Sequence, residues 1–187
     1  MKNLKKNSIS LLCLVAFLTL ALPAHAGGTN EKPTTYAIGD TGPVGGIVFY
    51  VTNGGLHGME AAPDDQHEGI GLCFSGVIPG ADGTAIGTGW QNTQDRLNDC
   101  EKRPIAASVA ADYPGPNGDS LGEWFLPSKD ALNELYLNKG VVGGFASDSY
   151  WSSSEDGRNE AHVQFFPGGH QTYGKEEVNR VRVVRAF

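Results

Sequence analysis

Two stretches of this sequence carry side chains that could do chemistry, and the first is a short acidic loop. Asp64, Asp65, His67 and Glu68 lie close together in the chain, and their carboxylates and imidazole are groups that bind calcium or a transition metal. The spacing is not that of an EF-hand, and no second group of ligands accompanies it. We therefore predict a solvated acidic loop and no metal site.

The patterns of known catalytic sites are missing. Ser152, Ser153 and Ser154 lack the GxSxG surroundings of a nucleophile elbow, and the histidines lack the spacing of an HExxH zinc motif. The glycine-rich run from Gly42 to Gly46 precedes a strand pattern, so it does not place a phosphate at the start of a helix. The sequence thus predicts a protein that is not an enzyme and has no cofactor; an enzyme of unknown class is the second alternative.

The second stretch, Asp156 to Asn179, is polar and contains several glycines and histidines. Its side chains suit adaptable polar recognition, and a tyrosine among them can act as an anchor. We predict that it presents a ligand-binding surface; an ordinary solvated hairpin is the competing interpretation. The candidate ligand-binding residues are Arg158, Asn159, Glu160, His162, Gln164, His170, Gln171, Tyr173 and Lys175.

Strong secondary-structure patterns lie on both sides of this polar stretch. Trp124 to Tyr136 (WFLPSKDALNELY) predicts a helix with Ser128 as its N-cap and Gly140 at its end. Tyr150 to Glu155 (YWSSSE) predicts a strand, and Arg180 to Phe187 (RVRVVRAF) predicts a terminal strand with valines on one face and arginines on the other. These elements form the frame that would position the polar side chains.

The rest of the chain mixes strands, loops and helices. Gly46 to Thr52 (GIVFYVT) predicts a buried strand, and Gly58 to Ala62 returns beside it after a turn. Pro63 to Gly89 reads as one long loop. Helical patterns follow over Asn92 to Cys100 and Ile105 to Tyr113. We predict an α+β, loop-rich domain in which two helices pack on short antiparallel sheets.

The N-terminus predicts export. Lys2, Lys5 and Lys6 precede a short apolar run that ends in Ala24-His25-Ala26, so residues 1–26 are predicted to be a signal peptide. Residues 27–35 would form a flexible leader and residues 36–187 a single domain. Cleavage lowers the 14 basic residues to 11 against 21 acidic ones, a formal net charge of −10. We therefore expect no nucleic-acid partner, no membrane span after cleavage, and a secreted, periplasmic or cell-surface location.

Two cysteines remain after signal cleavage, Cys73 and Cys100. In an exported chain an even pair favours one disulfide. Two unpaired thiols are the alternative that the sequence leaves open.

Five segments resemble a known family, the Lcl C-terminal domain of bacterial collagen-like adhesins, formerly a domain of unknown function. They are Ile38 to Thr52, Ala85 to Gly89, Trp124 to Tyr136, Tyr150 to Glu155 and Val181 to Phe187. The resemblance implies a C-type-lectin-like fold, in which a helix pair packs on short twisted sheets and the terminal strand pairs near the N-terminal one. It also implies an exported, non-enzymatic module for ligand binding or adhesion.

The chain departs from the namesake of that family, which is associated with sulfated polysaccharides and trimers. It has no collagen-like stem and is strongly acidic, and it lacks the EPN and WND calcium motifs of lectins. Some members of the superfamily are diversified by retroelements, and the resemblance extends that hypothesis to Asp156 to Asn179. We expect a carbohydrate or protein ligand at the cell surface, and leave oligomerisation open. A structural or assembly protein of the cell envelope is the alternative function.

Overall fold

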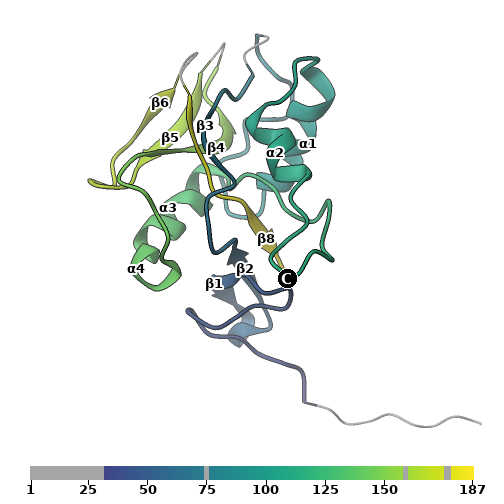
Figure 1. The fold of residues 1–187 in the computed structure, drawn as a ribbon, viewed down its shortest axis with the longest axis vertical. Coiled ribbons are helices and arrows are strands. Elements are labelled where there is room, and N and C mark those ends of the chain that lie inside the picture. Colours follow the sequence, from purple (N-terminus) through teal and green to yellow (C-terminus); the bar gives the residue numbers. More distant parts are fainter. Residues whose placement is uncertain (1–31, 74–75, 158–159, 175–177) are drawn as a thin grey trace, which may run out of the picture. The chain divides into compact units, whose positions relative to one another are not determined.

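Two small sheets and the helices that cover them make up the described part of the chain (Figure 1). The structure is a computed structural model, and it describes residues 32–73, 76–157, 160–174 and 178–187. Within it, Pro33–Phe187 form one compact unit. The predicted signal peptide, residues 1–26, and most of the predicted leader, residues 27–35, lie outside the described residues.

The smaller sheet joins the two ends of this unit. Its strands are β1 (Ile47–Thr52), β2 (His57–Ala61) and β8 (Val184–Ala186), and both pairings are antiparallel. Between β1 and β2 the chain turns through η1 (Asn53–Gly55), where Asn53 and Gly54 adopt positive φ angles. The C-terminal strand therefore lies against the N-terminal hairpin, beside the C label in Figure 1.

The larger sheet has five strands in the order β3-β7-β4-β5-β6. They are β3 (His67–Ile70), β4 (Ser149–Glu155), β5 (Ala161–Phe165), β6 (Gln171–Gly174) and β7 (Asn179–Val181). The pairing of β4 with β7 is parallel, and the other pairings are antiparallel. A β carbon at Gly174 would lie 2.6 Å from the ring of Trp151, so the edge strand β6 needs a glycine there.

Helices cover both faces of the larger sheet. They are α1 (Gly89–Asp99), α2 (Ala106–Ala111), α3 (Lys129–Leu137) and α4 (Lys139–Val142). Trp151 packs in one hydrophobic cluster with residues of α2, whereas its neighbour Tyr150 packs in a second cluster with residues of α3. Because consecutive side chains of a strand point to opposite faces, α2 and α3 lie on opposite sides of β4.

The α+β class predicted from the sequence is confirmed, and several details are corrected. The N-cap at Ser128 is confirmed, since its hydroxyl accepts a hydrogen bond from the Ala131 amide. Four helices, rather than two, lie in the described ranges, and α4 runs through Gly140. The sheets are not purely antiparallel, and β3 lies inside the segment predicted as a loop.

The predicted terminal strand is two strands in two sheets. The chain leaves β7 at Val181 and enters β8 at Val184, and the break falls at Arg182 and Val183. Arg180 and Arg182, predicted to lie on the face opposite the valines, both pair with Asp65, and the Arg182 side chain is fully buried. A carboxylate and four backbone carbonyl groups surround its guanidinium in the interior.

The disulfide between Cys73 and Cys100 is confirmed, with a sequence separation of 27 and 6.4 Å between their α carbons. It joins the chain after β3 to the C-terminal end of α1. No helix in the described ranges is both long and apolar enough to cross a membrane.

Replacement of both cysteines by serine is expected to lower the free energy of unfolding by about 3 kcal/mol, because the unfolded chain regains the freedom of the closed loop. Urea unfolding of the oxidised protein and of the Cys73→Ser/Cys100→Ser variant measures the difference. A reductant should destabilise the parent protein and leave the variant unchanged. Equal stability of the two proteins would contradict the prediction.

Candidate functional site

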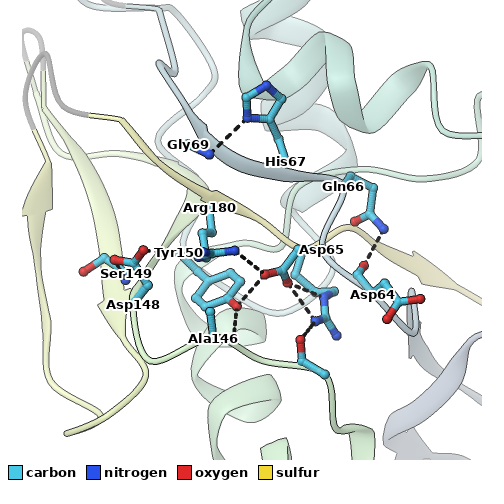
Figure 2. A network of polar contacts seen from close by, with 12 residues as sticks. Asp64, Asp65, Gln66, His67, Gly69, Ala146, Asp148, Ser149, Tyr150 and Arg180 are labelled. Atoms are coloured by element: carbon cyan, nitrogen blue, oxygen red, sulfur yellow. Dashed lines mark hydrogen bonds and ion pairs between the residues drawn. The ribbon is translucent and has the colours of Figure 1, made fainter.

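A network of charged and polar groups around Asp65 is the most concentrated chemistry in the described structure (Figure 2). One carboxylate oxygen accepts hydrogen bonds from the Tyr150 hydroxyl at 2.8 Å and from Arg180 at 3.2 Å. The other oxygen accepts from Arg182 Nε at 2.8 Å and lies 2.7 Å from Arg182 Nη2. Asp65 thus ties strands β4 and β7 to the chain that leads into β3.

The guanidinium of Arg182 is saturated with partners. It donates to the carbonyl oxygens of Ala62, Pro63, Gly143 and Gly144, at distances between 2.6 and 3.2 Å. Its face also lies over the Phe145 ring. Burial raises the pKa of the Tyr150 hydroxyl, so that hydroxyl stays protonated and donates to Asp65. Every group of this network is occupied by the fold itself, so we assign it to the scaffold.

The predicted solvated acidic loop is therefore only partly right. Asp64, His67 and Glu68 are exposed, as expected, but Asp65 is turned inward. Among the residues that the structure describes, no three His, Cys, Asp or Glu side chains gather as a group that could hold a metal ion.

The structure separates the nine predicted ligand-binding residues. His170 and Tyr173 are exposed, and Glu160 and Gln171 are half-buried. His162 and Gln164 are buried, because they lie on the face of β5 that α3 covers. These two predicted ligand-binding residues therefore do not lie on the exposed face of the hairpin. Arg158, Asn159 and Lys175 lie outside the described residues.

Gln164 belongs to the frame. Its amide nitrogen donates to the Gly169 carbonyl at 2.8 Å and to Asn133 of α3 at 3.4 Å. Its amide oxygen accepts from Gln171, which also donates to the Lys129 carbonyl. These bonds hold the β5–β6 hairpin against α3, so Gln164 and Gln171 position the surface rather than form it.

His162 instead reaches a groove at the end of this hairpin. The groove has a volume of about 460 Å³ and lies between the segment Val77–Thr84 and the chain around the β4–β5 turn. Ile78, Asp82, Glu155, Asp156 and His162 are among the residues that line it. We name this site the hairpin groove.

Hydrogen bonds to the end of β4 hold the loop side of the hairpin groove. Glu155 accepts the Ile78 amide with both carboxylate oxygens, at 3.1 and 2.9 Å, and the Glu155 amide donates to the Ala81 carbonyl. The Gly83 carbonyl accepts from Ser154 and from Asn92 of α1. A long loop without secondary structure is thereby fixed in one conformation, as expected of a preformed site.

The hairpin groove is acidic. Asp82 and Asp156 are exposed residues of its lining, and Glu155 is only 6% exposed. Burial raises the pKa of Glu155, while the Ile78 amide and the nearby Arg96 guanidinium lower it. No lysine or arginine is among the residues described as lining the groove.

His162 also lines the hairpin groove and has two partners. Its Nε2 lies 3.4 Å from Asp156 Oδ1, and its ring packs against the exposed Tyr173 ring at 5.1 Å. Burial lowers the pKa of His162 below 6.5, and the Asp156 carboxylate acts in the opposite direction. The imidazole is therefore neutral at pH 7 and able to donate and accept hydrogen bonds.

The sequence analysis missed the loop side of the hairpin groove. Asp82 and Ile78 lie in the long segment Pro63 to Gly89, to which no function was assigned from the sequence. Glu155 lies in the strand that was predicted to be part of the frame. The signal available was the length of that segment, since long ordered loops are often functional. Nothing local in the sequence indicates which strand end such a loop contacts.

Comparisons with known proteins place the chain in no family. No protein-family model matches the sequence, and no curated protein matches it. Among solved structures, one that is similar is a fimbrial protein from Bacteroides ovatus ATCC 8483, with 15% sequence identity and a TM-score of 0.45. The match covers 87% of this chain and 40% of the fimbrial protein, so the chain spans less than half of that protein's length. A likeness this distant says nothing about what the present chain binds.

Replacement of Asp65 by alanine is expected to lower the free energy of unfolding by about 3–5 kcal/mol, because it leaves the buried Arg182 guanidinium without its counter-charge. Chemical denaturation measures the change. Asp148→Ala is the matched control: its carboxylate is 55% exposed and pairs with Arg180, so its loss should cost at most about 1 kcal/mol. Equal effects of the two substitutions would show that the Asp65 network does not support the fold.

The pKa of the His162 imidazole is expected to lie below 6.5. It should be lower still in the Asp156→Asn variant, because this substitution removes the carboxylate that favours the charged form. Below pH 6.5 the unfolded chain takes up a proton that the folded site resists, so the free energy of unfolding falls as the pH drops from 6.5 towards the folded pKa. NMR titration of the His162 ring protons measures its pKa in the parent protein and in the Asp156→Asn variant. A higher pKa in Asp156→Asn would contradict the assignment.

Proposed function

We propose that this chain is an exported, non-enzymatic ligand-binding or adhesion module, and that its ligand binds in the hairpin groove. The observation that carries the proposal is that Glu155 and His162, both almost fully buried, form walls of an open groove. Buried ionisable groups on a groove wall are costly for stability and mark candidate functional sites. Each is also held in one orientation by a neighbour.

The charges of the hairpin groove restrict the ligand. Carboxylates accept hydrogen bonds and attract cations, and no basic side chain is described in the lining. The whole chain is acidic as well, with a formal net charge of −7. A neutral or cationic polar ligand fits, such as the hydroxyl groups of a carbohydrate or a basic segment of a protein. The described carboxylates of the groove would repel a sulfated polysaccharide.

The hydroxyl groups of the serine residues near the groove are bonded within the fold, which supports a binding site rather than a catalytic one. Ser152, Ser153 and Ser154 are buried, and the hydroxyls of Ser153 and Ser154 are engaged with Asn92 and with the Gly83 carbonyl. His162 faces Asp156 and Tyr173, with no described serine or cysteine at hydrogen-bond distance. This arrangement offers no activated nucleophile.

Export and the scaffold form part of the same proposal. We infer export from the signal-like residues 1–26, and the disulfide supports it because such bonds persist in oxidising compartments. We also infer a C-type-lectin-like scaffold related to the Lcl C-terminal domain. The pairing of β8 with the N-terminal hairpin supports that inference, since the resemblance implied a terminal strand in this place.

A screen of the mature chain against glycans and cell-surface proteins should identify a ligand. The Asp82→Asn/Asp156→Asn variant should bind this ligand about 10- to 100-fold more weakly, because two charged hydrogen-bond acceptors of the groove are lost. Isothermal titration measures the affinity. Asp64→Asn/Asp112→Asn, which changes exposed acidic residues of another groove, is the control and should bind normally. Equal affinities of both variants and the parent would place the ligand elsewhere.

A structural or assembly role is the second candidate, and one observation favours it. Strand β6 is an edge strand of the larger sheet, and Thr172 and Tyr173 on it are exposed. Exposed edges can pair with a strand of another chain. Light scattering of the mature protein distinguishes the two candidates: a stable oligomer dispersed by Tyr173→Glu would favour assembly, and a monomer would favour ligand binding.

A further inference from the structure

One of the three tryptophans is not explained by packing. Trp124 and Trp151 are buried, and their indole N–H groups donate to Ser120 and to the Ile70 carbonyl. Trp90 is 47% exposed, and its indole has no hydrogen-bond partner or ring contact among the described residues. A large, exposed indole is a common feature of interaction sites, where its ring supplies contact area at a low cost in conformational entropy.

The fold holds Trp90 in a defined position. It is the second residue of α1, and a β carbon at the preceding Gly89 would lie 2.5 Å from the Leu126 carbonyl oxygen. The Thr93 hydroxyl donates to the Gly89 carbonyl and accepts from the Leu126 amide. The first turn of α1 is thus fixed on the Leu126 backbone by its buried side, and Trp90 lies on the exposed side.

Beside Trp90 is a small cavity of about 270 Å³, which is distinct from the hairpin groove and shares no lining residue with it. Gly87, Trp90, Glu123, Phe125, Arg185 and Ala186 line it. The Phe125 ring is buried, so the cavity combines an apolar wall with the two charged side chains of Glu123 and Arg185.

These two charged side chains form part of a fixed ion-pair triad. Arg185 Nη1 donates to the fully buried Glu60 at 3.0 Å, and Arg185 Nε donates to Glu123 at 2.5 Å. Glu60 is itself held by the Gly46 amide. Among the described residues, Arg185 Nη2 and Glu123 Oε1 have no further hydrogen-bond partner. The lining of the cavity thus offers a donor and an acceptor in addition to the indole.

We propose that the cavity beside Trp90 binds one pyranose ring of a neutral glycan, without a metal ion. A pyranose has a face of C–H groups that packs on an indole, and its hydroxyl groups both donate and accept hydrogen bonds. Glu123 accepts from one hydroxyl, and Arg185 donates to a neighbouring one. Because the carboxylates of Glu60 and Glu123 compensate the charge of Arg185, the site does not select an anionic ligand.

The test is titration of the full mature protein with methyl glycosides of glucose, galactose, mannose and N-acetylglucosamine, in the presence of a chelator. Single rings bind in the millimolar range, so concentrations up to about 50 mM are needed. Saturation-transfer NMR should detect the sugar, and it should protect Trp90 from acrylamide quenching while the two buried tryptophans stay unaffected. Trp90→Ala should weaken binding at least about tenfold, Glu123→Gln should weaken it less, and Trp90→Phe should retain part of it.

Leu121→Ala is the matched control, because Leu121 is exposed and does not line the cavity. It should bind the glycosides as the parent protein does, and so should Asp82→Asn/Asp156→Asn, whose changes lie in the hairpin groove. The proposal is overturned if no glycoside binds, if binding requires calcium, or if Trp90→Ala binds as tightly as the parent protein. Loss of binding only in the Asp82→Asn/Asp156→Asn variant would also overturn it, while supporting the hairpin groove as the sugar site.

Discussion

The fold depends on the ion pair between Arg182 and Asp65. Arg182 lies at the break between β7 and β8, where the chain passes from the larger sheet to the smaller one. A buried guanidinium costs several kcal/mol in lost hydration unless a carboxylate and enough acceptors surround it. Asp65 and four backbone carbonyls supply them, and these carbonyls come from the segments after β2 and after α4. One side chain thereby joins the two sheets and the end of the helical segment.

The two proposed binding surfaces lie at the edges of the rigid frame that this ion pair supports. The hairpin groove is made by a loop that Glu155, Ser154 and Asn92 hold against β4 and α1. The cavity beside Trp90 is made by the first turn of α1 and by Arg185 of β8, which Glu60 fixes from inside the smaller sheet. In both places a buried carboxylate orients the polar groups at the surface. Loops and helix ends carried by such a frame are where binding sites usually lie.

The two proposed sites differ in charge and in what they select. The described lining of the hairpin groove carries three carboxylates and no lysine or arginine, although Arg96 lies near Glu155, so the groove favours cationic or hydroxyl-bearing ligands. The cavity beside Trp90 combines an aromatic plane with an ion-pair triad of two carboxylates and one guanidinium, so it does not attract an anion and suits a partly apolar ring. Two weak sites on one rigid module can act together on a repetitive ligand, because binding at one raises the effective concentration at the other.

The sequence by itself determined the features that depend on neighbouring residues. These are the N-cap of α3 at Ser128, the strands within Gly46 to Thr52 and Tyr150 to Glu155, and the α+β class. The disulfide between Cys73 and Cys100 was favoured by the sequence, and the structure decided it. Capping and hydrophobic periodicity are local, so they can be read without knowing the fold.

Only the tertiary structure decided which polar side chains line a groove and which are buried. The alternating pattern places Arg182 opposite the valines, but only the structure shows that the chain crosses between sheets there and that its guanidinium is buried. His162 and Gln164 lie in a polar segment, yet α3 covers their face of β5, and only His162 reaches a groove. Asp82 and Glu155 line the same groove although they are far apart in the chain. The orientation of a side chain depends on what packs against its strand, and that partner comes from a distant part of the sequence.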